Sequence, residues 1–266
     1  LIIVGERINT SRKAIAPAVE AKDGTLIQQE AVKQLEAGAQ YIDVNCGTMV
    51  DEEPEYLEWL VQTVQEATGG GLCSLDSPNP AALERALQAH RGKPLINSIT
   101  AEKERLEALL PLVRDYKTGI VALAMDDQGM PETAGERFEI AAYLVERLTK
   151  TGVALDDIYL DPMVRPVSTG GHYGRVVFET ISRIKREFPG IHTICGLSNI
   201  SYGLPARKLI NHTFLVMATM AGLDAAILDP LDKRLISLLY ASEVLLERDE
   251  YALNYISAFR EGKLEF

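Results

Sequence analysis

Eight short apolar, β-branched runs in the sequence each end in a polar side chain. The residues at these ends are, in chain order, Glu6, Asp43, Asp76, Asn97, Asp126, Asp161, Ser198-Asn199 and Asp229. Four of them are predicted to converge, because side chains at the carboxyl ends of parallel barrel strands face one mouth. These four are Asp76, Asn97, Asp161 and Asn199. The alternative is that each of them caps the helix that follows it.

The four side chains are carboxylates and amides, and no Lys or His stands at a strand end. A carboxylate accepts two parallel N–H bonds from a planar group, and an Asn amide both donates and accepts. The set therefore suits a neutral ligand rich in N–H groups. The N3–H and 2-amino edge of a pterin is one such group, and several other heterocycles fit the same chemistry.

The eight runs are near-continuously hydrophobic, which is typical of buried parallel strands. They are Leu1–Gly5, Tyr41–Val44, Leu72–Leu75, Leu95–Ile96, Ile120–Met125, Ile158–Leu160, Thr193–Leu197 and Ala225–Leu228. Amphipathic segments lie between them. The predicted helices are Thr25–Ala37, Pro54–Ala67, one that begins at Asn79-Pro80, Glu132–Lys150, Leu209–Ala221, Lys233–Leu246 and an extra C-terminal helix over Tyr251–Glu261.

Strict alternation of strands and helices predicts a single (β/α)8 TIM barrel of the α/β class over residues 1–266. Successive strand ends are separated by 21 positions (Asp76 to Asn97) up to 37 positions (Glu6 to Asp43), enough for one helix and two loops. The alternative is an open doubly wound sheet. That fold normally has a glycine-rich phosphate loop after the first strand, whereas this turn reads GERINTSRK.

Composition excludes several classes of protein. Hydrophobic residues make up 47% and charged residues 24% of the 266 residues, which is globular composition. A net charge of −11 disfavours nucleic acid as a partner, and every apolar run is too short for a membrane span or a signal peptide. Three separated cysteines, Cys46, Cys73 and Cys195, argue against a disulfide framework and favour the cytoplasm.

Metal chemistry is disfavoured by the same residues. The cysteines form no clustered thiolate motif, so a zinc-activated thiol site is not expected, and we predict that they are small buried side chains. The four histidines show no paired spacing. Asp43, Asp126 and Asp229 are an alternative set for a hard cation, but no base of the kind used by metal-dependent enolising barrels accompanies them.

Several motifs, in order along nearly the whole chain, carry a resemblance to a known family. The opening VGERIN-TSRK and the segment QLEAGAQYIDVN resemble the folate-binding module of cobalamin-dependent methionine synthases. LCSLDS, LINSIT, YLDPM, ICGLSNIS (Ile194–Ser201) and RKLINHTFLVMATMAGLDAAILD (Arg207–Asp229) resemble the methyltetrahydrofolate:corrinoid protein methyltransferases.

The resemblance implies a pterin-binding barrel, usually a homodimer, that moves a methyl group between N5 of tetrahydrofolate and the cobalt of a corrinoid. Asp76, Asn97 and Asp161 would bind the pterin, and Asn199 would reach N5. Gly196 and Ser198 would shape the turn after strand seven, and Arg207 would lie beside the site. Tyr202 occupies a loop position at which the related acetogenic enzymes differ.

The corrinoid is expected on a partner protein, because the chain lacks the DxHxxG pattern that binds cobalamin through a histidine. Asn199 would donate to N5 as negative charge develops there, with the proton coming from solvent. Two rival functions remain. One is a dihydropteroate synthase, whose first loop resembles NxTPDSFSDGG where this chain has ERINTSRK, and the other is a non-catalytic pterin-binding subunit.

Overall fold

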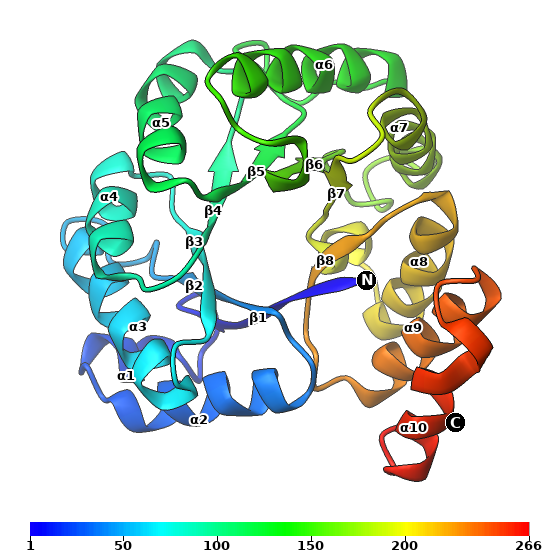
Figure 1. The fold of residues 1–266 in the computed structure, drawn as a ribbon, viewed down its shortest axis with the longest axis horizontal. Coiled ribbons are helices and arrows are strands. Elements are labelled where there is room, and N and C mark those ends of the chain that lie inside the picture. The colour runs from blue at the N-terminus through cyan, green and yellow to red at the C-terminus, as the bar shows by residue number, and fades with distance from the viewer. Residues whose placement is uncertain (266) are drawn as a thin grey trace.

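The structure is a computed structural model, and it describes residues 1–265. Strands and helices alternate along the chain (Figure 1). The strands are β1 (Ile2–Asn9), β2 (Tyr41–Asn45), β3 (Leu72–Asp76), β4 (Leu95–Ile99), β5 (Gly119–Leu123), β6 (Ile158–Asp161), β7 (His192–Thr193) and β8 (Ala225–Leu228).

The helices form the outer ring of the molecule, apart from short 3-10 turns in the loops (Figure 1). They are α1 (Ala16–Glu20), α2 (Gly24–Glu36), α3 (Glu53–Thr68), α4 (Pro80–Ala89), α5 (Lys103–Tyr116), α6 (Ala134–Lys150), α7 (Tyr173–Glu187), α8 (Arg207–Ala221), α9 (Lys233–Leu245) and α10 (Leu253–Arg260). The 3-10 turns are η1 (Leu155–Asp157), η2 (Leu197–Ser201) and η3 (Glu250–Ala252).

All paired strands run parallel, in the order β7-β6-β5-β4-β3-β2-β1-β8. The two ends of this order meet where Ile227 N–H donates to the Cys195 carbonyl across 2.9 Å, beside a bridge between Gly196 and Ile227. The sheet is therefore a nearly closed barrel with helices between the strands. The predicted (β/α)8 barrel is confirmed, and the open doubly wound alternative is wrong.

Four of the helices, α2, α4, α6 and α9, begin at a side chain that accepts a hydrogen bond from a free backbone N–H group. Asn79 accepts from Ala81 N–H at the start of α4, as its position before Pro80 predicts. Thr133 and Glu136 form a reciprocal capping box at the start of α6. Capping by residues within the loops leaves the strand-end side chains available for the barrel mouth.

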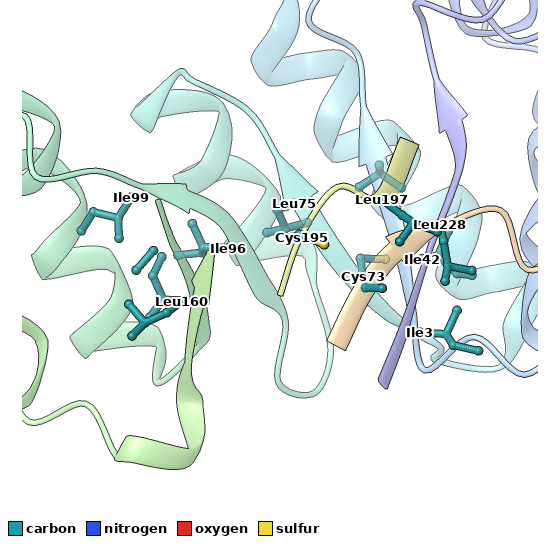
Figure 2. Packing of buried hydrophobic residues seen from close by; sticks show 14 of the residues in the cluster. Ile3, Ile42, Cys73, Leu75, Ile96, Ile99, Leu160, Cys195, Leu197 and Leu228 are labelled. Carbon is teal, nitrogen blue, oxygen red and sulfur yellow. The ribbon is translucent and has the colours of Figure 1, made fainter. Parts of the chain in front are cut away.

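Buried apolar side chains fill the space between the strands and the helices (Figure 2). A second cluster contains one residue from each of six strands or their continuations. Its members are Val4, Leu95, Val121, Tyr159, Ile194 and Ala225. All three cysteines are free and fully buried, as predicted, and burial raises the pKa of the Cys46 and Cys73 thiols to about 12.

Three strands differ from their predicted bounds by three residues or more at one end, and one of them is β4, which continues to Ile99 instead of ending at Ile96. β1 continues to Asn9 instead of ending at Gly5, with an irregular register between Gly5 and Ile8. β7 contains only His192–Thr193, because the chain turns at Gly196 into η2. Within the described residues, no helix is long and apolar enough to cross a membrane.

Candidate functional site

A polar cavity of about 640 Å³ lies at the carboxyl ends of the strands. Its wall contains seven of the eight residues proposed for the site, namely Asp76, Asn97, Asp161, Gly196, Ser198, Asn199 and Arg207. Tyr202 is not in this wall, and its side chain is 67% exposed. The cavity therefore brings together seven predicted residues from five parts of the chain and leaves Tyr202 outside.

Asp76 ends β3 with its carboxylate directed into the cavity wall. Asn45, at the end of β2, donates to Asp76 Oδ2 across 2.9 Å. Burial raises the pKa of Asp76, while the hydrogen bond from Asn45 and the nearby charge of Arg105 act in the opposite direction. The helix that follows is capped by Asn79, so Asp76 is not its cap.

Arg105 of α5 connects the loops that follow β3 and β4. Its Nη2 donates to the Ser77 carbonyl across 3.1 Å, its Nη1 to the Pro78 carbonyl across 2.6 Å and its Nε to the Ser98 carbonyl across 2.9 Å. One guanidinium thus holds both loops at a fixed separation. The two strand ends that carry Asp76 and Asn97 are positioned by the same cation.

Asn97 is 8% exposed and bonds to a second buried acid, Asp43. Its Nδ2 donates to Asp43 Oδ1 across 3.3 Å, and Ser74 Oγ donates to the same oxygen across 2.7 Å. The Asn97 amide therefore has its Oδ1 left for a ligand. Burial, followed by the charge of Asp76, raises the pKa of Asp43 well above its usual range.

Asp161 ends β6 and is 8% exposed. Its Oδ1 accepts the Met163 N–H across 2.7 Å, which is a local turn and not a helix cap. Burial raises the pKa of Asp161 to about 7, although the Met163 bond and the nearby Arg137 oppose the shift. Arg137 is fully buried beneath this turn and donates to the Pro162 and Met163 carbonyls.

Asn199 lies in η2, and its exposed side chain makes no hydrogen bond within residues 1–265. A Cβ added at Gly196 would lie 3.0 Å from Asn199 Nδ2, so a larger residue there would displace the amide. Arg207 donates to the Ser198 carbonyl across 2.7 Å and to Ser201 Oγ across 3.0 Å. The turn is thus fixed by its backbone, while the Asn199 amide is available to a ligand.

The cavity wall also contains residues that were not proposed for the site. Glu6, Asn9, Ser11 and Arg12 come from β1 and the loop after it. The sequence pattern identifies Glu6 only as a strand end. In the structure, burial raises the pKa of Glu6 to about 7. Asp43 was recognised as a strand end and as part of a possible cation set. The apolar part of the wall comes from Leu123, Met130, Met163, Val164 and Ile227.

The possible cation set does not gather in one place. Asp43 bonds to Ser74 in the cavity wall, Asp126 lines a separate groove between α5 and α6, and Asp229 pairs with Arg7 across 2.8 Å. No group of three potential metal ligands occurs within residues 1–265.

At the strand ends of this TIM barrel, two aspartates and an asparagine present to one cavity the hydrogen-bonding groups that suit a flat, nitrogen-rich ligand. Residues 5–229 match the pterin binding enzyme family. The chain belongs to this family, and the matched segment runs from β1 to the residue after β8.

Individual relatives are more specific. The chain is 37% identical over 266 residues to the methylcorrinoid:tetrahydrofolate methyltransferase of Eubacterium limosum, covering 99% of this chain and 98% of that protein. It is 31% identical over 241 residues to the methionine synthase of Mycobacterium tuberculosis, covering 85% of this chain but only 20% of that much longer protein.

Solved structures extend the likeness of fold. The dihydropteroate synthases of Vibrio fischeri and Thermus thermophilus match with TM-scores of 0.69 and 0.65 over 93% of this chain, and over 93% and 94% of their own. Their sequences are only 16% and 19% identical to this one. At that distance they show the shared barrel and nothing about the reaction.

Proposed function

We propose that this protein is a methyltransferase that moves a methyl group between N5 of tetrahydrofolate and the cobalt of a corrinoid carried by a partner protein. The observation that carries the proposal is the full-length, 37% identical relationship to a methylcorrinoid:tetrahydrofolate methyltransferase. The relationship to methionine synthases, which covers 85% of this chain, supports the same chemistry.

Asp76, Asn97 and Asp161 bind the pterin in this proposal. Each of these three residues makes one hydrogen bond to a neighbour: Asp76 Oδ2 accepts from Asn45, the Asn97 amino group donates to Asp43, and Asp161 Oδ1 accepts from the Met163 N–H. The other side-chain oxygen of each residue has no hydrogen bond within residues 1–265 and can accept one from a ligand. A reduced pterin offers N–H donors at its 2-amino group, N3 and N8. The three free acceptor oxygens of the protein match the N–H donors of the pterin, and this match supports the assignment of the three residues to pterin binding.

Asn199 activates N5. When the methyl group leaves, its former bonding pair stays on N5, and an unassisted nitrogen anion is a very poor leaving group. N5 must therefore gain a proton or a strong hydrogen bond by the transition state. The Asn199 amide has no hydrogen-bond partner within residues 1–265 and can donate to N5. One positioned donor contributes about 2.7–4 kcal/mol.

The remaining predicted residues shape the turn that carries Asn199. Gly196 leaves room for the amide, and Arg207 holds the Ser198 carbonyl. Tyr202 lies outside the cavity wall, with its ring centroid 5.9 Å from the Arg207 guanidinium. In our proposal it contacts the exposed tail of the folate or the partner protein, and not the pterin.

The corrinoid enters on its own protein. No DxHxxG pattern occurs in this chain, so no histidine is available in that motif to bind cobalamin. A partner with a basic face would suit the net charge of −11, and association would weaken as salt rises.

We further propose a cytoplasmic homodimer. Exposed apolar side chains at Leu209, Met217 and Met220 lie along α8, beside an apolar groove of about 820 Å³ between α8 and α9. A patch of this kind marks a protein–protein contact. It lies on the side of the barrel, so a second copy there would leave the mouth open to the corrinoid protein (Figure 1). The three free, buried cysteines fit a reducing compartment.

The test is an anaerobic assay with 5-methyltetrahydrofolate and several purified corrinoid proteins in the Co(I) state. We expect the spectrum of the methylated corrinoid to appear with at least one partner, and no condensation of a pterin pyrophosphate with p-aminobenzoate. Condensation would instead identify a dihydropteroate synthase. Tight folate binding without transfer to any corrinoid protein would identify a non-catalytic pterin-binding subunit.

A further inference from the structure

The Glu6 carboxyl lies half-buried in the wall of the cavity without a hydrogen-bond partner in residues 1–265. The other acids of the wall differ in this respect. Asp43, Asp76 and Asp161 each accept at least one hydrogen bond from the protein. Burying a carboxyl group without a hydrogen-bond partner raises the free energy of the folded state. The position of Glu6 therefore suggests a functional role.

The local backbone is built to direct Glu6 into the wall. The pairing of β1 with β2 shifts register between Gly5 and Ile8, which is a bulge at Glu6 and Arg7. Gln34 of α2 is fully buried, and its Oε1 accepts the Arg7 N–H across 3.0 Å. A Cβ at Gly5 would lie 2.3 Å from that oxygen, so only glycine leaves room for it.

Glu6 also borders a second, smaller chamber. This side chamber of about 320 Å³ lies between β8, η2 and α8, and Glu6 and Ser198 are in the walls of both cavities. Charged groups elsewhere in the side chamber are paired, since Arg7 binds Asp229 and Asp232 binds Lys208 and His212. Glu6 is therefore the unpaired acid between the two spaces.

The surroundings tune Glu6 for proton exchange near neutral pH. Burial raises its pKa to about 7, and the Asp229 carboxylate adds to the rise. Arg12, Arg207 and Arg7 oppose it. Asp43, whose own pKa rises partly because of Glu6, faces it from β2. A group that titrates near pH 7 can both give and take a proton during turnover.

We propose that Glu6 is the proton-exchange residue of the methyl transfer, with one side toward the pterin and the other toward the side chamber. This proposal rests on the proposed function. In the direction away from folate, the N5–methyl bond breaks, its electron pair stays on N5, and the new bond to methyl uses an electron pair of the corrinoid. The Glu6 carboxylic acid supplies the proton that N5 takes up, through Asn199-bound water, and regains one from water in the side chamber.

In the opposite direction the same steps run backwards. The electron pair of N5 attacks the methyl group on the corrinoid, and the proton of N5 passes to the Glu6 carboxylate. The side chamber then releases this proton while folate and the corrinoid protein cover the mouth. Asn199 stabilises the charge at N5 in both directions of transfer, while Glu6 donates the proton to N5 in one direction and accepts it in the other.

Proton uptake on binding tests the proposal without turnover. Covering Glu6 with the pterin removes water from it and favours its neutral form. Calorimetry of 5-methyltetrahydrofolate binding in buffers of different ionisation enthalpy should show fractional proton uptake that peaks near pH 7 in the parent protein. It should be reduced in Glu6→Gln to the share contributed by Asp161, whose pKa also lies near 7, and unchanged in Glu107→Gln, which alters an exposed acid of α5.

The pH profile of transfer is the second readout. Glu6→Gln should lower the single-turnover rate about 10²-fold and remove the limb near pH 7 that the parent shows. Leu231→Trp, which fills part of the side chamber, should slow repeated turnover while folate affinity stays at the parent value. Leu231 also lines the groove proposed for the dimer contact, so sedimentation must show that the variant keeps the parent's oligomeric state. Parent-like turnover in Leu231→Trp would overturn the role of the side chamber.

Absence of proton uptake in the parent between pH 6 and 8 would overturn the proposal even if Glu6→Gln failed to fold. Transfer by Glu6→Gln with an unchanged pH profile would also overturn it and leave the proposed function intact. Proton uptake without methyl transfer to any corrinoid protein would contradict the proposed function, and would leave Glu6 as a titrating residue of a pterin site with no role in methyl transfer.

Discussion

Asn97 donates its side-chain N–H to Asp43 across 3.3 Å in the cavity wall, and both residues are more than 90% buried. This contact sets which end of the amide faces the ligand. With the amino group on Asp43, the Asn97 carbonyl oxygen is the group presented to the pterin. The ligand edge opposite it must therefore be a donor.

Removal of Asp43 should weaken folate binding without removing a direct pterin contact. In Asp43→Ala the Asn97 amide can rotate and present its amino group to a donor. We expect a loss of affinity of about 1–3 kcal/mol for 5-methyltetrahydrofolate, measured by calorimetry. Ser74→Ala, which keeps the Asp43–Asn97 contact, is the control and should lose less. Parent-like affinity in Asp43→Ala would show that another group orients Asn97.

Asp76→Ala and Asp161→Ala should each weaken binding of the same ligand. Each change leaves a buried pterin N–H without its acceptor, which costs about 1–3 kcal/mol. The matched control is Asp126→Ala, because Asp126 also follows a strand but lines a different groove. Equal affinities for all three variants, measured by calorimetry, would assign the two strand-end carboxylates to the fold and not to the ligand.

His192, at the opposite end of the barrel, makes stability depend on pH. Its Nε2 lies 3.0 Å from Asp156 Oδ1, its Nδ1 lies 3.4 Å from Asp224 Oδ2, and its ring stacks on Tyr159. The Asp224 carboxylate, and then that of Asp156, raise the pKa of His192 above 6.5. The protonated ring therefore stabilises the fold below pH 6.5, and this contribution disappears as pH rises through the raised value.

Thermal unfolding across this range tests the effect. His192→Gln should lower Tm at pH 6 and should approach the parent Tm above the raised pKa. His172→Gln, which replaces an exposed histidine, is the control and should follow the parent throughout. A deficit in His192→Gln that is the same at every pH would mean that packing on Tyr159, and not charge, accounts for its contribution.

The proposed dimer is tested at α8. Met217 is 49% exposed beside the apolar groove, and a carboxylate placed there would lose its water in a dimer contact. Sedimentation at micromolar concentration should show a dimer for the parent and for Val50→Glu, an exposed site near the start of α3, but a monomer for Met217→Glu. A parent that sediments as a 29.3 kDa monomer would contradict the proposal.

The barrel and the polar strand-end residues of the cavity wall could be predicted, because buried parallel strands appear in the sequence as continuous apolar runs with a polar residue at each end. The helix-cap alternative for Asp76, Asn97 and Asp161 is wrong, because the helices that follow them, α4, α5 and α7, have Asn79, Glu102 and His172 at their N-cap positions. The strand-end pattern therefore predicted the fold and also placed these residues in one cavity wall.

Other features of the fold and the cavity depend on contacts between residues far apart in the sequence, which the pattern of apolar runs and strand ends does not reveal. β1 continues past Gly5 because Gln34, from a distant helix, bonds the bulge at charged residues that break the apolar run. The short β7 reflects the turn at Gly196. No helix is predicted over α5, because Pro111 within it interrupts the helical pattern of the sequence. Asp43 is part of the cavity wall because its carboxylate reaches Ser74 and Asn97, which lie far away in the sequence.

The central claim is methyl transfer at N5 assisted by Asn199, and a single-turnover measurement with a Co(I) corrinoid protein tests it most directly. Asn199→Ala should transfer methyl about 10²–10³ times more slowly than the parent. Its affinity for 5-methyltetrahydrofolate should fall much less, because the bond to N5 strengthens only as the methyl group leaves. A parent rate of transfer in Asn199→Ala, with stability lowered by about 1 kcal/mol, would contradict the account and reduce Asn199 to a turn residue.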